Sequence, residues 1–309
     1  MNDEDRKINA VHPDVAAILH ELGGQAPLRR PYEVEQLRER SRFQLRYAAQ
    51  APDMARVEES VAGASAVPLR IFTPANDRGS AVVLYFHGGG WVTGQLDLYD
   101  AQLRLLADAA AAKVIGVGYR PAPEYPYPSA EHDADAALSW AVEHYGASRR
   151  IVIAGDSSGG YLVAGLTQRA TAAGSALALQ VLIYPILDRE TTSWSFERFS
   201  EGGVLNRELM TWYWAQYLGP RDVREEATSP LRTTELAMLP PTLIVAAGED
   251  VLVAQNRRYA ARLIEAGVDT TYLELPDMVH GYLRWTGRVA AARDTVSRIG
   301  SEIIRTTCS

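Results

Sequence analysis

The chain has 309 residues, enough for one large α/β domain or two small ones with a substantial buried core. Its 31 Lys and Arg against 38 Asp and Glu give a net charge of −7, which argues against binding to nucleic acid or to an anionic membrane. A composition of 47% hydrophobic and 22% charged residues with one cysteine, Cys308, excludes collagen-like and disordered classes, intramolecular disulfides and cysteine-based zinc sites.

The first residues are acidic and charged, without the basic and apolar regions of a signal peptide, and no apolar run reaches the length of a membrane helix. The cytoplasm is therefore the expected location. Two helices are predicted next, from Pro13 to Leu22 and from Tyr32 to Gln50, separated by glycine and proline.

From residue 81 onward, short apolar runs alternate with amphipathic stretches. The predicted strands are Ala81 to Phe86, Val114 to Val117, Ile151 to Ala154, Leu177 to Tyr184, Thr242 to Ala247 and Thr270 to Leu275. The predicted helices are Tyr99 to Ala112, His132 to His144, Gly159 to Ala173, Ala254 to Ala266 and Val289 to Ile304. This alternation predicts an α/β fold with a mostly parallel sheet and helices on both faces.

One segment interrupts the alternation, between the strands that end at Tyr184 and begin at Thr242. It contains a predicted helix from Arg207 to Leu218, and its length and aromatic content favour a lid that packs with the N-terminal helices. Four of its aromatic residues either line a substrate pocket or form the lid's own core: Trp194, Trp212, Tyr213 and Trp214.

The most informative motif is Gly155-Asp156-Ser157-Ser158-Gly159, which joins a predicted strand to a predicted helix. A serine at such a tight turn adopts a strained backbone conformation that exposes its hydroxyl, and the flanking glycines allow the strand and helix to approach. Ser157 is therefore the candidate nucleophile.

A second glycine motif, His87-Gly88-Gly89-Gly90-Trp91, follows the first of these strands. Its backbone N–H groups, with that of Ser158, are the predicted oxyanion hole. His87 is expected to orient this loop by hydrogen bonding, and Trp91 is a candidate pocket residue.

A serine hydroxyl needs a base, and His280 is the candidate because it lies in a loop between the last strand and the last helix. The carboxylate that orients it should follow the preceding strand, which ends at Glu249-Asp250. Asp250 is preferred, Glu249 is the alternative and Asp277 a third. The order Ser157, Asp250, His280 is that of an α/β-hydrolase.

With these motifs the chain resembles the hormone-sensitive-lipase family of α/β-hydrolases, in particular its bacterial carboxylesterase branch. The resemblance also rests on Tyr119-Arg-Pro-Ala-Pro-Glu124, Leu182-Ile-Tyr-Pro-Ile-Leu-Asp188, Ser229-Pro-Leu-Arg232, Leu239-Pro-Pro-Thr-Leu243 and His280-Gly-Tyr282. It implies an α/β-hydrolase fold in one domain, residues 1–309, with a helical cap from about 1–55 and about 188–225.

The resemblance implies Ser157 as nucleophile, His280 as base, Asp250 as its partner, and an oxyanion hole from Gly88, Gly89, Gly90 and Ser158. The predicted function is hydrolysis of short- to medium-chain acyl esters, with a small-molecule ester as partner and no metal or organic cofactor. Dimers are common in such families, so a homodimer is compatible with the resemblance. An amidase, arylformamidase or deacetylase on the same triad is the alternative, and a non-catalytic small-molecule binding protein is a remote one.

Overall fold

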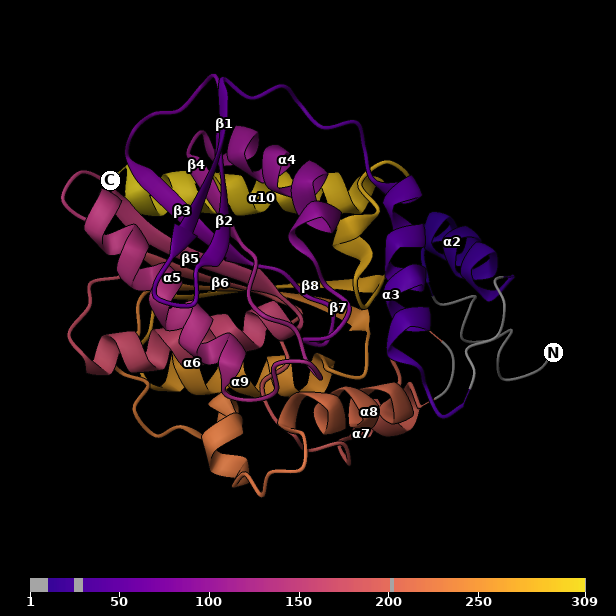
Figure 1. Ribbon diagram of the computed structural model, residues 1–309. Coiled ribbons are helices and arrows are strands. Elements are labelled where there is room, and N and C mark those ends of the chain that lie inside the picture. The colour runs from indigo at the N-terminus through magenta and orange to yellow at the C-terminus, as the bar shows by residue number, and fades with distance from the viewer. Residues whose placement is uncertain (1–10, 25–29, 201–202, 309) are drawn as a thin grey trace.

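An eight-stranded sheet is the centre of the computed structural model, which describes residues 11–24, 30–200 and 203–308 (Figure 1). The strands are β1 (Arg56–Ala62), β2 (Val67–Thr73), β3 (Ala81–Phe86), β4 (Lys113–Val117), β5 (Arg150–Asp156), β6 (Leu179–Ile183), β7 (Thr242–Glu249) and β8 (Thr270–Val279). Their order across the sheet is β1-β2-β4-β3-β5-β6-β7-β8. The pairs β1/β2 and β2/β4 are antiparallel and the others are parallel, which confirms a mostly parallel sheet.

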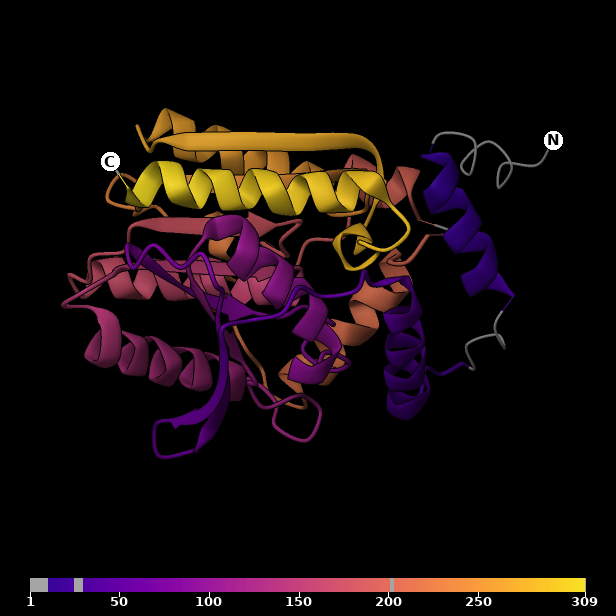
Figure 2. The same ribbon diagram turned by 90° about the horizontal axis from the view of Figure 1, so that it is seen from above.

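Helices cover both faces of the sheet (Figures 1 and 2). The α-helices are α2 (Pro13–Gly23), α3 (Val34–Phe43), α4 (Asp100–Ala110), α5 (Ser129–Tyr145), α6 (Ser158–Ala172), α7 (Trp194–Arg198), α8 (Arg207–Leu218), α9 (Val253–Glu265) and α10 (Ala290–Thr307). Short 3₁₀ helices are η1 (Gln44–Tyr47), η2 (Leu96–Tyr99), η3 (Glu225–Thr228), η4 (Pro230–Arg232) and η5 (Tyr282–Arg284). Helices α4 and α10 lie on one face, and α5, α6 and α9 on the other.

Successive side chains of a strand point to opposite faces of the sheet, so the core has two parts, one on each face. All six residues of β3 are buried. Leu84 belongs to the core on the α5, α6 and α9 side, whereas Val83 and Tyr85 belong to the core on the α4 and α10 side. Burial on both faces is the reason that this strand is an uninterrupted apolar run.

The hairpin formed by β1 and β2 was not predicted from the sequence, whose first predicted strand begins at Ala81. Strand β1 is an edge strand with most of its residues exposed or half-buried, so its sequence lacks a strong apolar pattern. In β2, Val67, Leu69 and Ile71 are buried at a spacing of two, but Pro68 lies between them and weakens the strand signal.

Helices α2, α3, α7 and α8 lie together at one end of the sheet (Figures 1 and 2). Helix α3 is shorter than the predicted Tyr32–Gln50 and continues into η1. The Tyr32 ring meets the Trp212 ring edge-on at 6.0 Å, and Arg30 pairs with Glu208 at 2.7 Å, so the N-terminal segment contacts α8. Within the described ranges, no helix combines the length and apolarity needed to cross a bilayer.

Candidate active site

Ser157 occupies the turn between β5 and α6, with φ 54° and ψ −118°. A non-glycine residue rarely adopts a positive φ, and such strain is typical of functional turns. Neither neighbouring glycine has room for a side chain: a Cβ at Gly159 would lie 1.9 Å from the Phe86 carbonyl oxygen, and one at Gly155 would lie 2.6 Å from Gly159. The close approach of β3, β5 and α6 therefore fixes the serine at the carboxyl end of the central strand.

Three side chains from separate elements form a continuous hydrogen-bonded chain. Ser157 Oγ lies 2.8 Å from His280 Nε2, and His280 Nδ1 lies 2.7 Å from Asp250 Oδ2. The other oxygen of Asp250 accepts a bond from the Leu252 N–H at 3.0 Å. All three are largely buried, with Asp250 2% exposed and His280 9% exposed. This arrangement has the geometry of a nucleophile, a base and a group that orients the base.

The two alternative carboxylates lie elsewhere. Glu249 is half-buried and lines the same cavity as Ser157, and burial raises the pKa of its carboxyl group. Asp277 accepts a bond from the His12 N–H through its backbone carbonyl. Of the three candidate acids, Asp250 is the one whose carboxylate contacts His280.

The glycine loop after β3 lies beside the serine, but its three glycines are not equivalent. The N–H of Gly88 donates to Asp156 Oδ1 and to the Tyr99 hydroxyl, both at 3.0 Å, so the prediction that Gly88 contributes to the oxyanion hole is wrong. Gly89 has φ +112°, and a Cβ at Gly90 would lie 2.3 Å from the Tyr213 ring. Among the described residues, the N–H groups of Gly89, Gly90 and Ser158 have no hydrogen-bond partner.

Asp156 is a further functional candidate, which the sequence motif alone did not single out. Besides the Gly88 N–H, its carboxylate accepts the hydroxyl of Tyr85 at 2.9 Å and that of Tyr99 at 3.0 Å. It is fully buried, and burial raises its pKa, whereas the tyrosine hydrogen bonds oppose that rise. Its position directly before the serine was visible in the sequence, but the convergence of two tyrosines from β3 and η2 was not.

His87 orients the loop as expected, because its Nδ1 lies 3.0 Å from the Gly88 carbonyl oxygen and its ring stacks on Tyr119 at 4.3 Å. Burial lowers the pKa of His87 to about 4, so the imidazole is neutral at pH 7. A neutral, buried ring next to the glycine loop suits a structural role.

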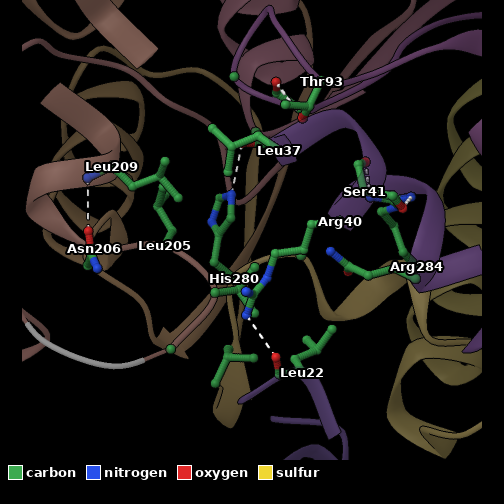
Figure 3. Close-up of a pocket in the computed structure, with 18 of the residues that line it drawn as sticks. Leu22, Leu37, Arg40, Ser41, Thr93, Leu205, Asn206, Leu209, His280 and Arg284 are labelled. Carbon is green, nitrogen blue, oxygen red and sulfur yellow. Dashed lines mark hydrogen bonds between the residues drawn. The ribbon is translucent and has the colours of Figure 1, made fainter. Parts of the chain in front are cut away.

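A cavity of about 720 Å³ opens above Ser157 and His280. Its walls come from α2, α3, η5, the glycine loop and the segment around α8 (Figure 3). Apolar lining residues include Leu22, Leu37, Leu205, Leu209 and Met210, and polar ones include Arg40, Asn206, Glu249 and Arg284. A concave, largely apolar space beside the nucleophile is typical of a small-molecule site.

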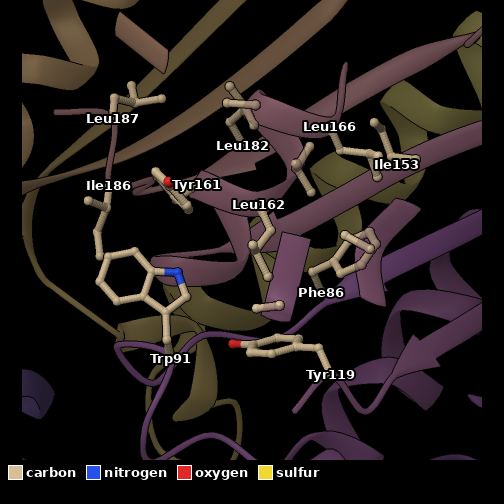
Figure 4. Close-up of a cluster of buried hydrophobic side chains, with 14 of the residues drawn as sticks. Phe86, Trp91, Tyr119, Ile153, Tyr161, Leu162, Leu166, Leu182, Ile186 and Leu187 are labelled. Carbon is tan, nitrogen blue, oxygen red and sulfur yellow. The ribbon is translucent and has the colours of Figure 1, made fainter. Parts of the chain in front are cut away.

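Trp91 is not part of this cavity, so its prediction as a pocket residue is wrong. Its indole is 1% exposed and stacks on Tyr217 at 4.1 Å, inside the apolar cluster of Figure 4. Trp91 has φ +61°, a turn that directs the ring into the core. Of the aromatic residues in the insertion, Tyr213 lines the cavity, whereas Trp214 packs against Trp91 at 4.6 Å.

Within the described part of the chain, no group of three or more His, Cys, Asp or Glu side chains is arranged to hold a metal ion.

The chain is similar to known α/β-hydrolases over most of its length. The model of the alpha/beta hydrolase fold family matches residues 83–284. The chain is 35% identical over 274 residues to carboxylesterase NlhH of Mycobacterium tuberculosis, covering 84% of this chain and 86% of that protein. It is 35% identical over 228 residues to an ethyl acetate hydrolase of Pseudomonas putida, covering 71% and 72%.

Solved structures are similar over nearly the full length. A thermostable esterase from Pseudomonas putida aligns with a TM-score of 0.87 at 31% identity, covering 96% of this chain and 98% of that one. An ester hydrolase from the Lake Arreo metagenome aligns with a TM-score of 0.90 at 29% identity, covering 97% and 100%. The chain belongs to the α/β-hydrolase family, in the hormone-sensitive-lipase-like branch that contains these carboxylesterases.

Proposed function

We propose that this protein is a serine carboxylesterase with Ser157 as nucleophile, His280 as general base and Asp250 as the residue that orients the base. One observation carries the proposal: the unbroken hydrogen-bonded chain from Ser157 Oγ through His280 to Asp250, at the floor of a cavity. The family relatives named carboxylesterase and ethyl acetate hydrolase support the same reaction.

The reaction proceeds in two steps. Ser157 Oγ attacks the ester carbonyl carbon as His280 Nε2 takes the hydroxyl proton; the bond to the alcohol oxygen then breaks, and the alcohol leaves with that proton. Water next attacks the acyl-serine, giving one proton to His280, and the carboxylic acid departs as Ser157 recovers its hydroxyl proton. The Asp250 carboxylate stabilises the imidazolium formed in each step.

The tetrahedral intermediates carry a negative charge on the former carbonyl oxygen. We assign its stabilisation to the N–H groups of Gly89, Gly90 and Ser158, which have no other partner among the described residues. Ser158 is also the first residue of α6, so the helix directs its positive end toward the same oxygen. Such donors typically lower the barrier by about 3 kcal/mol each.

We further propose that residues from about 1–55 and 188–225 form a cap over one α/β domain and limit the acyl chain to short and medium lengths; of these, residues 1–10, 25–29 and 201–202 lie outside the described ranges. Helices α2, α3 and α8 supply much of the cavity wall, and its volume of about 720 Å³ suits a chain of modest length. In a series of p-nitrophenyl esters, kcat/KM should peak between about four and ten carbons. A peak at sixteen carbons or more would contradict this assignment.

The nucleophile is tested by Ser157→Ala, which should lower ester hydrolysis by at least about 10⁴-fold while the fold is kept, and should abolish labelling by a fluorophosphonate. Retention of most activity in a folded variant would overturn the mechanism. A matched set of esters and amides distinguishes the esterase from an amidase on the same triad, because only an amidase would cleave the amides at a comparable rate.

The carboxylate assignment is tested by two neighbouring substitutions. Asp250→Asn should lower kcat by about 10³- to 10⁴-fold because it removes the charge that stabilises the imidazolium. Glu249→Gln, at a half-buried carboxylate that forms no hydrogen bond with His280 in the described structure, should have a far smaller effect on kcat. The reverse order of effects would move the role to Glu249.

We also propose that the protein is cytoplasmic and forms a homodimer. The single cysteine and the net charge of −7 are compatible with a reducing, aqueous compartment. Cell fractionation tests the location, and size-exclusion chromatography with light scattering tests the oligomeric state.

A further inference from the structure

Two arginine side chains share the cavity with Ser157 and His280. Arg40 comes from α3, and Arg284 comes from η5, four residues after the histidine. In Figure 3 both lie on one side of His280, and the apolar Leu205 and Leu209 lie on the other. The two arginines therefore lie on the side of His280 opposite Leu205 and Leu209.

In the described part of the chain, the hydrogen bonds of both guanidinium groups leave some of their N–H donors unused. Arg40 donates to the Leu22 carbonyl at 3.0 Å, and Arg284 donates to the hydroxyl and carbonyl of Ser41, both at 3.1 Å. All of these acceptors are neutral, although a guanidinium has five N–H donors and prefers an anion. Among the described residues neither arginine forms an ion pair with a carboxylate, and burial alone lowers the pKa of Arg40.

The other arginines of α3 differ from Arg40 in this respect. Arg38 binds Glu124 through two nitrogens at 2.8 Å, and Arg42 pairs with Glu35 at 2.8 Å. Neither of them lines the cavity. On this helix, the arginine that faces the site is thus the one without an acidic partner in the described structure.

Among the described residues the two acidic residues of the cavity form no ion pair with Arg40 or Arg284, although the charge of Arg284 acts on Asp156 and opposes the rise of its pKa. The Asp156 carboxylate accepts the hydroxyls of Tyr85 and Tyr99 and the N–H of Gly88. Glu249 is half-buried, and the positive charge acting on it comes from Arg198. Within the described ranges no carboxylate takes the remaining N–H donors of Arg40 and Arg284, so both guanidinium groups can bind an anionic ligand.

We infer that the site accepts esters that carry a carboxylate remote from the scissile bond, with Arg40 and Arg284 binding that carboxylate and the apolar lining residues, such as Leu205 and Leu209, contacting the remainder of the molecule. The inference rests on the proposed ester hydrolysis at Ser157. Half-buried guanidinium groups that have lost part of their hydration gain charge-assisted hydrogen bonds when such a substrate binds. The carboxylate can belong to the acyl arm, as in a monoester of a dicarboxylic acid, or to the alcohol arm.

The test compares esters of matched length and different charge. For the acyl arm these are mono-p-nitrophenyl adipate, p-nitrophenyl hexanoate and p-nitrophenyl 6-(trimethylammonio)hexanoate; for the alcohol arm, 4-carboxyphenyl hexanoate and phenyl hexanoate. In either the acyl-arm or the alcohol-arm set, the anionic ester should have a kcat/KM at least about tenfold above that of each uncharged or cationic ester of the same set. The difference should come from a lower KM. The arm that shows the preference identifies the source of the carboxylate.

Substitutions test whether Arg40 and Arg284 cause the preference for anionic esters. Arg40→Gln and Arg284→Gln should each lower the ratio of anionic to neutral kcat/KM by about tenfold through KM, and Arg40→Lys should restore part of it. Arg42→Gln, on the same helix but outside the cavity, is the control and should leave the ratio unchanged. A ratio near one on both arms, or a ratio that neither glutamine variant alters, would overturn the inference.

Cleavage of the neutral ester distinguishes a failure of this inference from a failure of the proposed function. If the neutral hexanoate ester is cleaved without any anionic preference, only this inference fails; if Ser157-dependent cleavage of the neutral ester is absent, the proposed function fails first. Should a variant not fold, inhibition of the wild-type enzyme decides: adipate should inhibit hydrolysis of the neutral ester at a concentration at least about tenfold lower than hexane-1,6-diol does. Equal inhibition by the two would contradict the inference.

Discussion

A single carboxylate, that of Asp156, connects the turn of the nucleophile to the glycine loop. It precedes Ser157 in the chain and accepts three hydrogen bonds, from Tyr85, Tyr99 and the Gly88 N–H. A carboxylate presents acceptors only, so it satisfies three converging donors at once. The loop that carries Gly89 and Gly90 is thereby fixed relative to the serine.

Asp156→Asn should disturb this arrangement while keeping the side-chain volume. An amide NH₂ would face at least one of the three donors, leaving a buried group unsatisfied at a cost of about 1–3 kcal/mol. We expect a lower free energy of unfolding and a kcat reduced by about tenfold or more, because the oxyanion donors shift. Chemical denaturation and steady-state kinetics measure both, and an unchanged kcat would contradict the positioning role.

The lowered pKa of His87 predicts that the free energy of unfolding depends on pH. Its pKa is about 4 in the folded protein against 6.5 in the unfolded chain, so below pH 6.5 the unfolded chain takes up a proton that the folded protein does not. The free energy of unfolding should fall as the pH drops from about 6.5 to about 4, with a total loss of about 3 kcal/mol from this residue.

The matched variant for that experiment is His87→Asn, which keeps a donor near the position of Nδ1. Denaturation curves at pH 7, 5.5 and 4 should show a smaller loss in the variant than in the wild type. The comparison removes the contribution of buried carboxyl groups such as Asp156, which is common to both proteins. Parallel losses would mean that His87 does not carry the effect.

Individual side chains were predictable from the sequence where a motif specifies their chemistry. Ser157 and His280 are examples, and their hydrogen bond joins residues 123 positions apart. Gly88 and Trp91 were misassigned because a motif does not tell which N–H of a loop points inward or which way a ring turns at positive φ. Arg40 and Arg284 were missed because a cavity between distant segments leaves no local pattern.

At the scale of elements, the contact between β3 and α6 decides where the serine lies. The helix begins one residue after Ser157 and passes so close to Phe86 that Gly159 has no space for a Cβ. Strand, turn and helix are therefore one rigid unit, and the glycines are the residues that permit it.

Gly159→Ala should lower the free energy of unfolding by about 4 kcal/mol or more, because its Cβ would lie 1.9 Å from the backbone oxygen of Phe86. Gly165→Ala is the control on the same helix: its Cβ would meet only the flexible end of Arg169, at 3.3 Å. The control should be neutral or stabilising by up to about 1 kcal/mol. Thermal and chemical denaturation of both variants test this, and similar effects would contradict it.

The elements themselves were largely predictable because their burial produces regular patterns. The fully buried β3 and the helix α8 were predicted with their observed bounds. The hairpin of β1 and β2 was not, since an edge strand exposed to solvent has little need of apolar residues.

At the scale of the whole molecule, the N-terminal segment is bonded to the chain just after His280. The Trp285 indole N–H donates to Gln44 at 3.0 Å, and Arg284 donates to Ser41. The Gly287 N–H donates to the Tyr47 carbonyl at 2.8 Å. Segments more than 230 residues apart thus support the loop of the catalytic histidine, a relation that no local pattern reveals.

Trp285→Phe tests this support. It removes the bond to Gln44 and part of a fully buried ring that meets Tyr47 edge-on at 6.5 Å, so we expect a loss of about 2–3 kcal/mol in the free energy of unfolding. The value of kcat should fall as well, because the loop of His280 loses a contact. Trp194→Phe, at a side chain that is 46% exposed, is the control and should change stability by less than about 0.5 kcal/mol.

The bonds between the N-terminal segment and the histidine loop also bear on how the protein folds. Ser157, Asp250 and His280 come from the ends of three different strands, and the residues just after the base are bonded to the N-terminal segment. Such non-local contacts form late, because the entropy of closing large loops must be overcome first. During refolding, esterase activity should therefore return after the helical circular dichroism signal. Recovery of activity would then measure formation of the complete native structure, whereas the circular dichroism signal would measure earlier formation of helices.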